Sequence, residues 1–164
     1  MQKIRAFPAK IEFQHLWWLA EVLDLGMSDG GIDLGDHKLG VEMKCRYQKY
    51  QNSNYAVHAY QVDEFKNQNP NKELFWGFVL YGLSEEPKKI PKDADLDKFI
   101  THRSAWFFPW DWVRQFPIAN PRTGPYRYVS SKAIRASGPF TEHTKGGGKL
   151  YLPKGCEALE QRLL

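Results

Sequence analysis

The stretch GGIDLGDHKLGVEMKCR, residues 30–46, contains two short apolar runs separated by the turn-forming segment Gly35–Lys38. Apolar runs on either side of such a turn predict a β-hairpin. The turn is either Asp36-His37 alone or the whole of Gly35–Lys38, and its even length places position 33 opposite position 40. Odd positions of the first strand then share a face with even positions of the second.

This register divides the hairpin into a charged face and an apolar face. Asp33, Glu42 and Lys44 share the charged face. The other face collects apolar side chains that can pack beneath a helix, namely Ile32, Leu34, Leu39, Val41, Met43 and Cys45. Asp33 and Glu42 become diagonal neighbours with Cα atoms about 7–8 Å apart. One cation between them can therefore bind both carboxylates.

The three charged side chains suit hydrolysis of a phosphodiester. Mg²⁺ prefers oxygen ligands and keeps several waters, so we expect Asp33 and Glu42 to bind Mg²⁺ or Mn²⁺. Lys44 can stabilise charge on a phosphate or help to deprotonate the attacking water. The alternative is that all three are solvated charges on an exposed hairpin, because an isolated Glu-x-Lys is common.

Helical and apolar segments surround the hairpin. In residues 11–25, apolar side chains recur at the i, i+3, i+4, i+7 spacing of an amphipathic helix that ends at Gly26. Residues 55–67 also predict a helix, and the continuous apolar run 74–83 predicts a strand buried on both faces. The expected order is helix, hairpin, helix, strand.

This order, with Asp33 on one strand and Glu42-x-Lys44 on the next, resembles the PD-(D/E)xK nuclease superfamily over residues 11–83. The phrase Ser28-Asp29-Gly30-Gly31-Ile32-Asp33 is similar to the Gly-Asp-Gly-Gly-Val/Ile-Asp signature of Mrr-type restriction endonucleases, whose last aspartate binds metal. The resemblance implies an α/β (α+β), restriction-endonuclease-like fold with helices flanking a mixed central sheet. It also implies a metal-dependent deoxyribonuclease in which Lys44 is the catalytic lysine.

Two further residues are candidates through the same resemblance. Gln61-x-x-x-Phe65 is similar to the Gln-x-x-x-Tyr of RecB-type nucleases, so Gln61 is a candidate catalytic residue, although a polar residue on a helix commonly just faces solvent. Glu12 falls on the apolar stripe of the first helix, and related folds often take an additional metal ligand from this helix. The alternative for Glu12 is an acid favoured in a first turn by the helix dipole.

Other candidate chemistries find less support in the sequence. Asp36 suits the turn, and Asp29 precedes two glycines, so both rank below Asp33 as the metal ligand. The five histidines and two cysteines show no spacing typical of a zinc site or a disulfide framework. No GxxxxGK[ST] segment is present, which argues against nucleotide hydrolysis.

The length of 164 residues and the 42% hydrophobic content favour a single nuclease domain, residues 1–164. Its catalytic core is residues 11–83, followed by an exposed loop at 84–98 and a basic, aromatic half at 99–164. In this last half we expect a strand over 105–113 broken at Pro109. The remainder is expected to be mostly turns and loops, with a short strand near 149–152.

Positive charge is concentrated in the C-terminal part. Residues 101–164 hold 10 Lys and Arg against 4 Asp and Glu, whereas residues 1–100 hold 13 against 15. Such asymmetry favours a phosphate-rich partner, most simply DNA, although a solvated basic surface would look the same. The candidate DNA-binding residues are Arg122, Arg127, Lys132, Arg135, Lys145 and Lys149.

No membrane segment or signal peptide is evident, so we expect a cytoplasmic enzyme without a membrane partner. Many related nucleases pair to cut both strands, which makes a homodimer possible. The main alternative to an enzyme is a nucleic-acid-binding module of the same fold without significant turnover.

Overall fold

The computed structural model describes residues 2–28, 31–50, 54–120, 122 and 124–164, and the side chains of residues 2–8 and 50 lie outside this description. Asp29 and Gly30, both part of the predicted signature, also lie outside the described residues. The helices are α1 (Gln2–Leu23), α2 (Ala59–Gln68), α3 (Ser131–Ala136) and α4 (Glu157–Glu160). The 3-10 turns are η1 (Gln48–Tyr50), η2 (Pro87–Lys89), η3 (Leu96–Lys98), η4 (Trp110–Gln115) and η5 (Gln161–Leu163).

The strands form a large mixed sheet and a small antiparallel one. The large sheet runs in the order β1 (Gly26–Met27), β2 (Leu34–Gly35), β3 (Leu39–Tyr47), β5 (Glu73–Leu83), β6 (Ile100–Pro109), β10 (Gly148–Pro153), β9 (Phe140–Lys145). The pairs β3–β5 and β6–β10 are parallel, and the other neighbours are antiparallel. The small sheet contains β4 (Tyr55–His58), β8 (Tyr126–Val129) and β7 (Ile118–Ala119).

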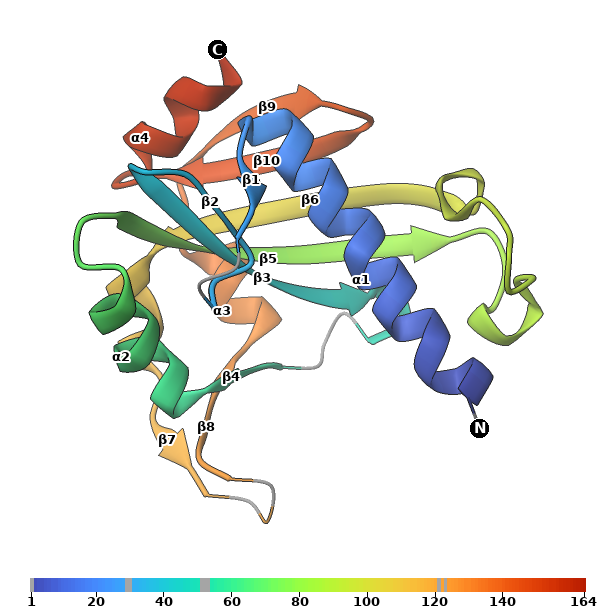
Figure 1. Cartoon of the computed structure of the whole chain (residues 1–164), viewed down its shortest axis with the longest axis horizontal. Coiled ribbons are helices and arrows are strands. Elements are labelled where there is room, and N and C mark those ends of the chain that lie inside the picture. The colour runs from blue at the N-terminus through green and yellow to red at the C-terminus, as the bar shows by residue number, and fades with distance from the viewer. Residues whose placement is uncertain (1, 29–30, 51–53, 121, 123) are drawn as a thin grey trace.

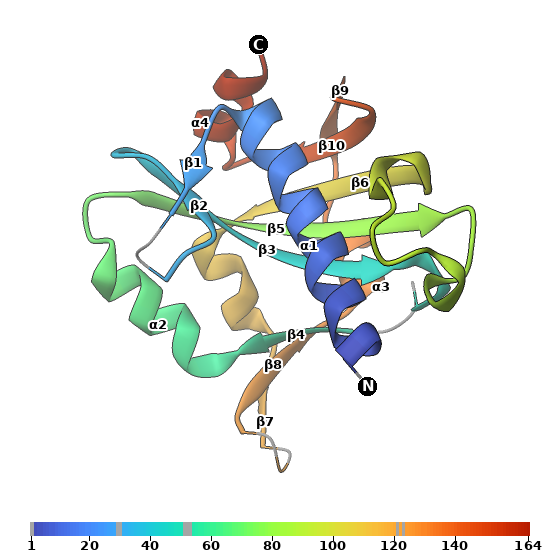
Figure 2. The ribbon, with the colours of Figure 1, turned by 45° about the vertical axis from the view of Figure 1, so that its right-hand side comes forward.

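Helices cover both faces of the large sheet (Figures 1 and 2). Odd-numbered residues of the central strands, such as Val41, Phe75 and Phe107, pack in one core with α1 and the C-terminal helical turns. Even-numbered residues such as Trp76 and Phe108 pack in a second core with α2, α3, η4 and the small sheet. Burial on both faces explains why the sequence of β5 is almost continuously apolar.

The expected mixed α+β architecture, with helices flanking a central sheet, is confirmed. The long strand at 74–83 is present as β5, and β6 ends at Pro109 as expected. In the described part of the chain, no helix is long and apolar enough to cross a membrane.

Residues 55–58 are a correction, because they form β4 rather than the start of the expected helix. Tyr55 and Val57 are buried while Ala56 between them is exposed, which is the two-residue alternation of a strand. The whole of β4 pairs with β8, some 70 positions later in the chain. This distant partner, rather than local preference, makes the segment extended.

The C-terminal half is also more regular than expected. Strands β6, β10 and β9 complete one side of the large sheet, and α3 follows β8. The short strand expected near 149–152 is β10, which pairs with β6 on one side and β9 on the other. In the described part of the C-terminal half, prolines and glycines lie mostly in the connections between strands and helices. Their number therefore led to the incorrect expectation that this half is mostly turns and loops.

Ile32 is a further correction, since it packs in the core opposite to the one that contains Leu34. Gly40 explains the position, because a Cβ there would lie 3.0 Å from Ile32 Cδ1 and 2.8 Å from Leu74 Cδ2. The two side chains fill the space that a side chain at position 40 would occupy. The chain leaves regular strand geometry between Ile32 and Leu34, at Asp33.

Met43 tests which face of β3 is buried. Its side chain is 1% exposed in the core beneath α1. We expect Met43→Asp to lower the free energy of unfolding by at least about 4 kcal/mol, because it removes apolar contacts and buries an unpaired charge. Met43→Leu, the matched control, keeps the volume and should cost less than about 1.5 kcal/mol. Chemical denaturation followed by circular dichroism would measure both, and a well-folded Met43→Asp protein would contradict this assignment.

Candidate active site

The ladder between β2 and β3 is short and contains two residue pairs. Leu34 pairs with Val41 and Gly35 with Gly40, and the Asp36 N–H donates to the Leu39 carbonyl to close the turn. Continuing this register places position 33 opposite position 42. The register expected from the sequence, 33 opposite 40, is therefore wrong by two residues. The even turn length, and with it the sharing of one face, is retained.

Two hydrogen bonds connect Asp33 to Glu42 and to the main chain next to Glu42. The Asp33 N–H donates to Glu42 Oε1 at 2.9 Å, and the Met43 N–H donates to Asp33 Oδ2 at 2.9 Å. Each carboxylate thus satisfies a main-chain donor at the point where the β2–β3 ladder stops. The Asp33 side chain is thus held by the main chain of β3, and the Glu42 side chain by the main chain of Asp33.

Lys44 completes the group on the same strand. Its Nζ lies 3.9 Å from Glu42 Oε2. The Lys44 side chain is 25% exposed, whereas that of Glu42 is 7% exposed. The ammonium group is therefore at the boundary with solvent and the Glu42 carboxylate is behind it. Asp33, Glu42 and Lys44, predicted to lie together, do so.

The Glu42 carboxyl group has a raised pKa. Desolvation by burial is the largest cause, and the negative charge of Asp33 raises the pKa further, as does a hydrogen bond between the two side chains. The positive charge of Lys44 and the Asp33 N–H act in the opposite direction without cancelling the shift. Carboxyl groups whose pKa is strongly perturbed by desolvation and by a neighbouring charge are candidates for a functional site.

Glu12 of α1 is exposed. The expectation that it points inward is wrong, because its side chain is exposed while Ile11 and His15 occupy the core-facing positions. Surrounding protein nonetheless raises its pKa by desolvation, the charge of Asp33 raises it further, and Lys44 lowers it. Across the described residues, no group of three or more His, Cys, Asp or Glu side chains is placed to hold a metal ion. Glu12 is thus electrostatically coupled to Asp33 and Lys44.

Gln61 lies in the first turn of α2, whose Val62 and Phe65 pack in the second core. Its Oε1 is buried and has no hydrogen-bond partner among the described residues. The structure therefore gives Gln61 an unsatisfied acceptor, but records no contact between it and the carboxylate pair.

Asp36 has a structural role at the turn, as its residue type predicts. Its carboxylate accepts hydrogen bonds from the N–H groups of Lys38 and Leu39 and forms an ion pair with Arg162. Although desolvation opposes the shift, these contacts lower the pKa of Asp36 to about 2. Arg162 also donates to the Asp24 carbonyl, so it ties the hairpin turn to the end of α1.

The six predicted DNA-binding residues do not share one surface. They divide among the β7–β8 ribbon (Arg122, Arg127), α3 (Lys132, Arg135) and the β9–β10 hairpin (Lys145, Lys149). The ribbon and the β9–β10 hairpin lie at opposite ends of the molecule (Figures 1 and 2). The six residues are therefore spread over separate parts of the molecule.

Individual members of this set are also engaged in the fold. The Arg127 Nη1 donates to the carbonyls of Arg114 and Phe116. Lys149 lies 3.9 Å from Glu142. Lys132 and Arg135 are exposed on α3, whose Ile134 packs in the second core. Of the three pairs, the one on α3 lies over the sheet face that Glu42 and Lys44 share.

Arg46 follows Lys44 by two residues on β3 and is not among the site residues predicted from the sequence. The alternation of a strand places it on the same face as Glu42 and Lys44. The same parity that grouped those two residues was the available signal.

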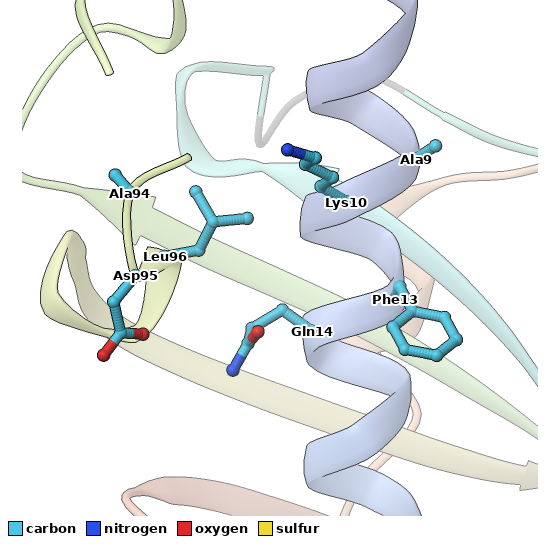
Figure 3. A pocket seen from close by; sticks show the side chains of 7 residues that line it. All are labelled: Ala9, Lys10, Phe13, Gln14, Ala94, Asp95 and Leu96. Carbon is cyan, nitrogen blue, oxygen red and sulfur yellow. The ribbon is translucent and has the colours of Figure 1, made fainter. Parts of the chain in front are cut away.

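A separate open pocket of about 450 Å³ lies between α1 and the segment before β6 (Figure 3). Its lining residues are Ala9, Lys10, Phe13, Gln14, Ala94, Asp95 and Leu96. None of the predicted catalytic residues lines it. Lys10 bridges the helix and the loop by donating to the Lys92 carbonyl.

Comparison of the chain with known protein families, with curated proteins and with solved structures found no match. The candidate site therefore rests on its own geometry.

The raised pKa of Glu42 predicts how stability changes with pH in the absence of metal. A carboxyl group with a raised pKa holds its proton more tightly in the folded protein. The folded state therefore loses stability as the pH rises from the ordinary value of 4.5 toward the raised one. Glu42→Gln removes this penalty and keeps an oxygen that can accept from Asp33.

In chelator, the melting temperature of Glu42→Gln minus that of the wild type should be small at about pH 5 and more positive at about pH 8. Glu86→Gln, an exposed glutamate in the loop before β6, is the matched control. A difference that shrinks as the pH rises would show that the Glu42 carboxylate is stabilised by its surroundings.

Proposed function

We propose that this protein is a magnesium-dependent nuclease of the PD-(D/E)xK type that hydrolyses phosphodiester bonds of DNA. The observation that carries the proposal is the reciprocal anchoring of Asp33 and Glu42, with Lys44 Nζ 3.9 Å from Glu42. A buried Glu42 carboxylate and a partly exposed Asp33 carboxylate are held against their mutual repulsion, with a partly exposed ammonium group beside them, which is poorly explained as a solvated surface.

The donor set fits Mg²⁺ or Mn²⁺. Magnesium is commonly bound by one or two carboxylates together with water and substrate phosphate, so a third protein ligand is not required. The oxygens left over from the main-chain hydrogen bonds, Asp33 Oδ1 and Glu42 Oε2, are the atoms that would hold the ion. A bound ion supplies a Lewis acid and lowers the pKa of its water.

The protein side chains set the geometry of the reaction. Asp33 and Glu42 are oriented by main-chain donors before any ligand arrives, so little reorganisation accompanies binding. Lys44, at the solvent boundary, is placed to contact a phosphate oxygen and stabilise the charge that develops on it. The same ammonium group can alternatively assist removal of a proton from the attacking water.

The topology around the site also supports the proposal. An antiparallel β2–β3 hairpin leads through α2 to β5, which is parallel to β3, while α1 covers the opposite face. This arrangement is similar to the helix, hairpin, helix, strand order of the restriction-endonuclease-like fold. The added β4 and the C-terminal strands lie outside that order.

Cleavage should require Mg²⁺ or Mn²⁺. Circular and linear DNA incubated with the protein should be cut with either ion, remain intact in chelator, and be cut poorly with Ca²⁺. Calcium has a larger and less regular coordination shell, which misplaces the attacking water. Full activity in chelator would rule out the metal site, and binding without cutting in Mg²⁺ would favour a binding module.

The three hairpin residues should be separately essential. Asp33→Asn, Glu42→Gln and Lys44→Ala should each lower the cleavage rate by at least about 100-fold while the far-ultraviolet circular dichroism spectrum is unchanged. Lys38→Ala, at the exposed tip of the same hairpin, is the matched control for Lys44→Ala and should cut normally. If the variants remain folded and cut at the wild-type rate, the site is elsewhere.

A further inference from the structure

Three side chains follow one another along a single face of β3. Glu42, Lys44 and Arg46 are the even-numbered residues of the second half of the strand, so their Cα atoms are spaced by roughly 6.6–6.8 Å. The proposed catalytic lysine is thus followed on the same line by a guanidinium group. The β2–β3 ladder ends at Val41, so no β2 strand pairs alongside this part of β3.

Arg46 is incompletely satisfied in the protein. Its Nη2 donates to the Asn54 carbonyl, and its Nε is buried without a hydrogen-bond partner in the part of the chain that the structure describes. Among the described residues, no carboxylate forms an ion pair with it. By contrast, Arg103 pairs with Asp97 and Arg162 with Asp36. A buried donor without an acceptor costs free energy, so its position calls for an anionic acceptor.

A second guanidinium group approaches the same region from α3. Tyr55 of β4 is buried, with its hydroxyl donating to the Val79 carbonyl. Desolvation raises the pKa of Tyr55, as does Cys45, while the charges of Arg46 and Arg135 both lower it. The charges of Arg46 and of the exposed Arg135 therefore both act on the buried Tyr55.

We propose that Arg46 is a phosphate-binding residue that grips the backbone phosphate next to the one being cut. The inference rests on the proposed nuclease function and deepens it by naming how the substrate strand lies along β3. The planar guanidinium can offer two parallel N–H donors to a phosphate, a geometry that lysine lacks. Contacts with backbone phosphates position the strand without reading its sequence.

The test uses the full-length protein and an end-labelled DNA duplex with one uncharged methylphosphonate linkage. The wild type should cut less at bonds flanking the neutral linkage on one side than in unmodified DNA, because the contact with Arg46 is lost. Arg46→Gln should lower kcat/KM on unmodified DNA by about tenfold and cut those flanking bonds at their normal relative rates. Lys88→Ala, an exposed loop residue, should behave as the wild type.

Arg46→Lys tests the guanidinium geometry separately from the positive charge. It keeps the positive charge but not the forked donor, so its kcat/KM should fall between those of the wild type and Arg46→Gln. In binding measurements with Ca²⁺, Arg46→Gln should also reduce the slope of log affinity against log salt by about one. If Arg46→Gln fails to fold, the flanking-bond pattern is read from Arg46→Lys.

The outcomes separate the two proposals. If the wild type cuts DNA but the Arg46 variants show the wild-type flanking-bond pattern, Arg46 does not bind the neighbouring phosphate and the nuclease proposal stands. If the wild type neither binds nor cuts DNA in Mg²⁺, the nuclease function fails and the inference about Arg46 fails with it.

Discussion

The paired hydrogen bonds between Asp33 and the Glu42–Met43 segment are the constraint on which the rest of the site depends. They replace the ladder bonds that a regular hairpin would form at this position, so carboxylates rather than carbonyls satisfy the backbone. Two like charges are held close together as a result, and the pKa of Glu42 rises. The charged form of Glu42 lowers the stability of the folded protein, and the two main-chain hydrogen bonds hold the Asp33–Glu42 pair in place despite this cost.

The sheet explains why this strained pair can persist. Residues 39–43 of β3, most of β5, and Ala105, Phe107 and Phe108 of β6 are buried, between the core beneath α1 and the core beneath α2 and α3. The hydrophobic effect of two cores stabilises β3, and a local electrostatic cost is small beside it. Glu42 and Lys44 therefore lie on a rigid strand, and the Met43 N–H of the same strand holds the Asp33 carboxylate, which favours a fixed geometry.

Features that depend on adjacent residues were predicted well from the sequence, and features that depend on distant parts of the chain were predicted poorly. The two-residue period grouped Asp33, Glu42 and Lys44, and the continuous apolar run located β5, because both patterns are contained in a few adjacent residues. The exact register was missed by two residues, because Asp36 pairs with Leu39 and the turn is centred on His37 and Lys38, one residue later than expected. Strands β4, β7, β8 and β9 were missed for a different reason: their extended form depends on pairing with other strands, for β4 and β8 with partners far along the chain. The exposed position of Glu12 was missed because a helical stripe indicates only roughly which residues face the core.

The ion pair between Asp36 and Arg162 has a consequence for the order in which the protein matures during synthesis. Its two partners are 126 residues apart, and Arg162 also holds the end of α1 through the Asp24 carbonyl. A ribosome-bound chain can form the hairpin early, yet its turn stays untethered until residue 162 emerges from the exit tunnel. Strand β10, which lies between β6 and β9, is likewise made late. The segment that carries the Asp33–Glu42 pair is thus translated long before the residue that tethers its turn.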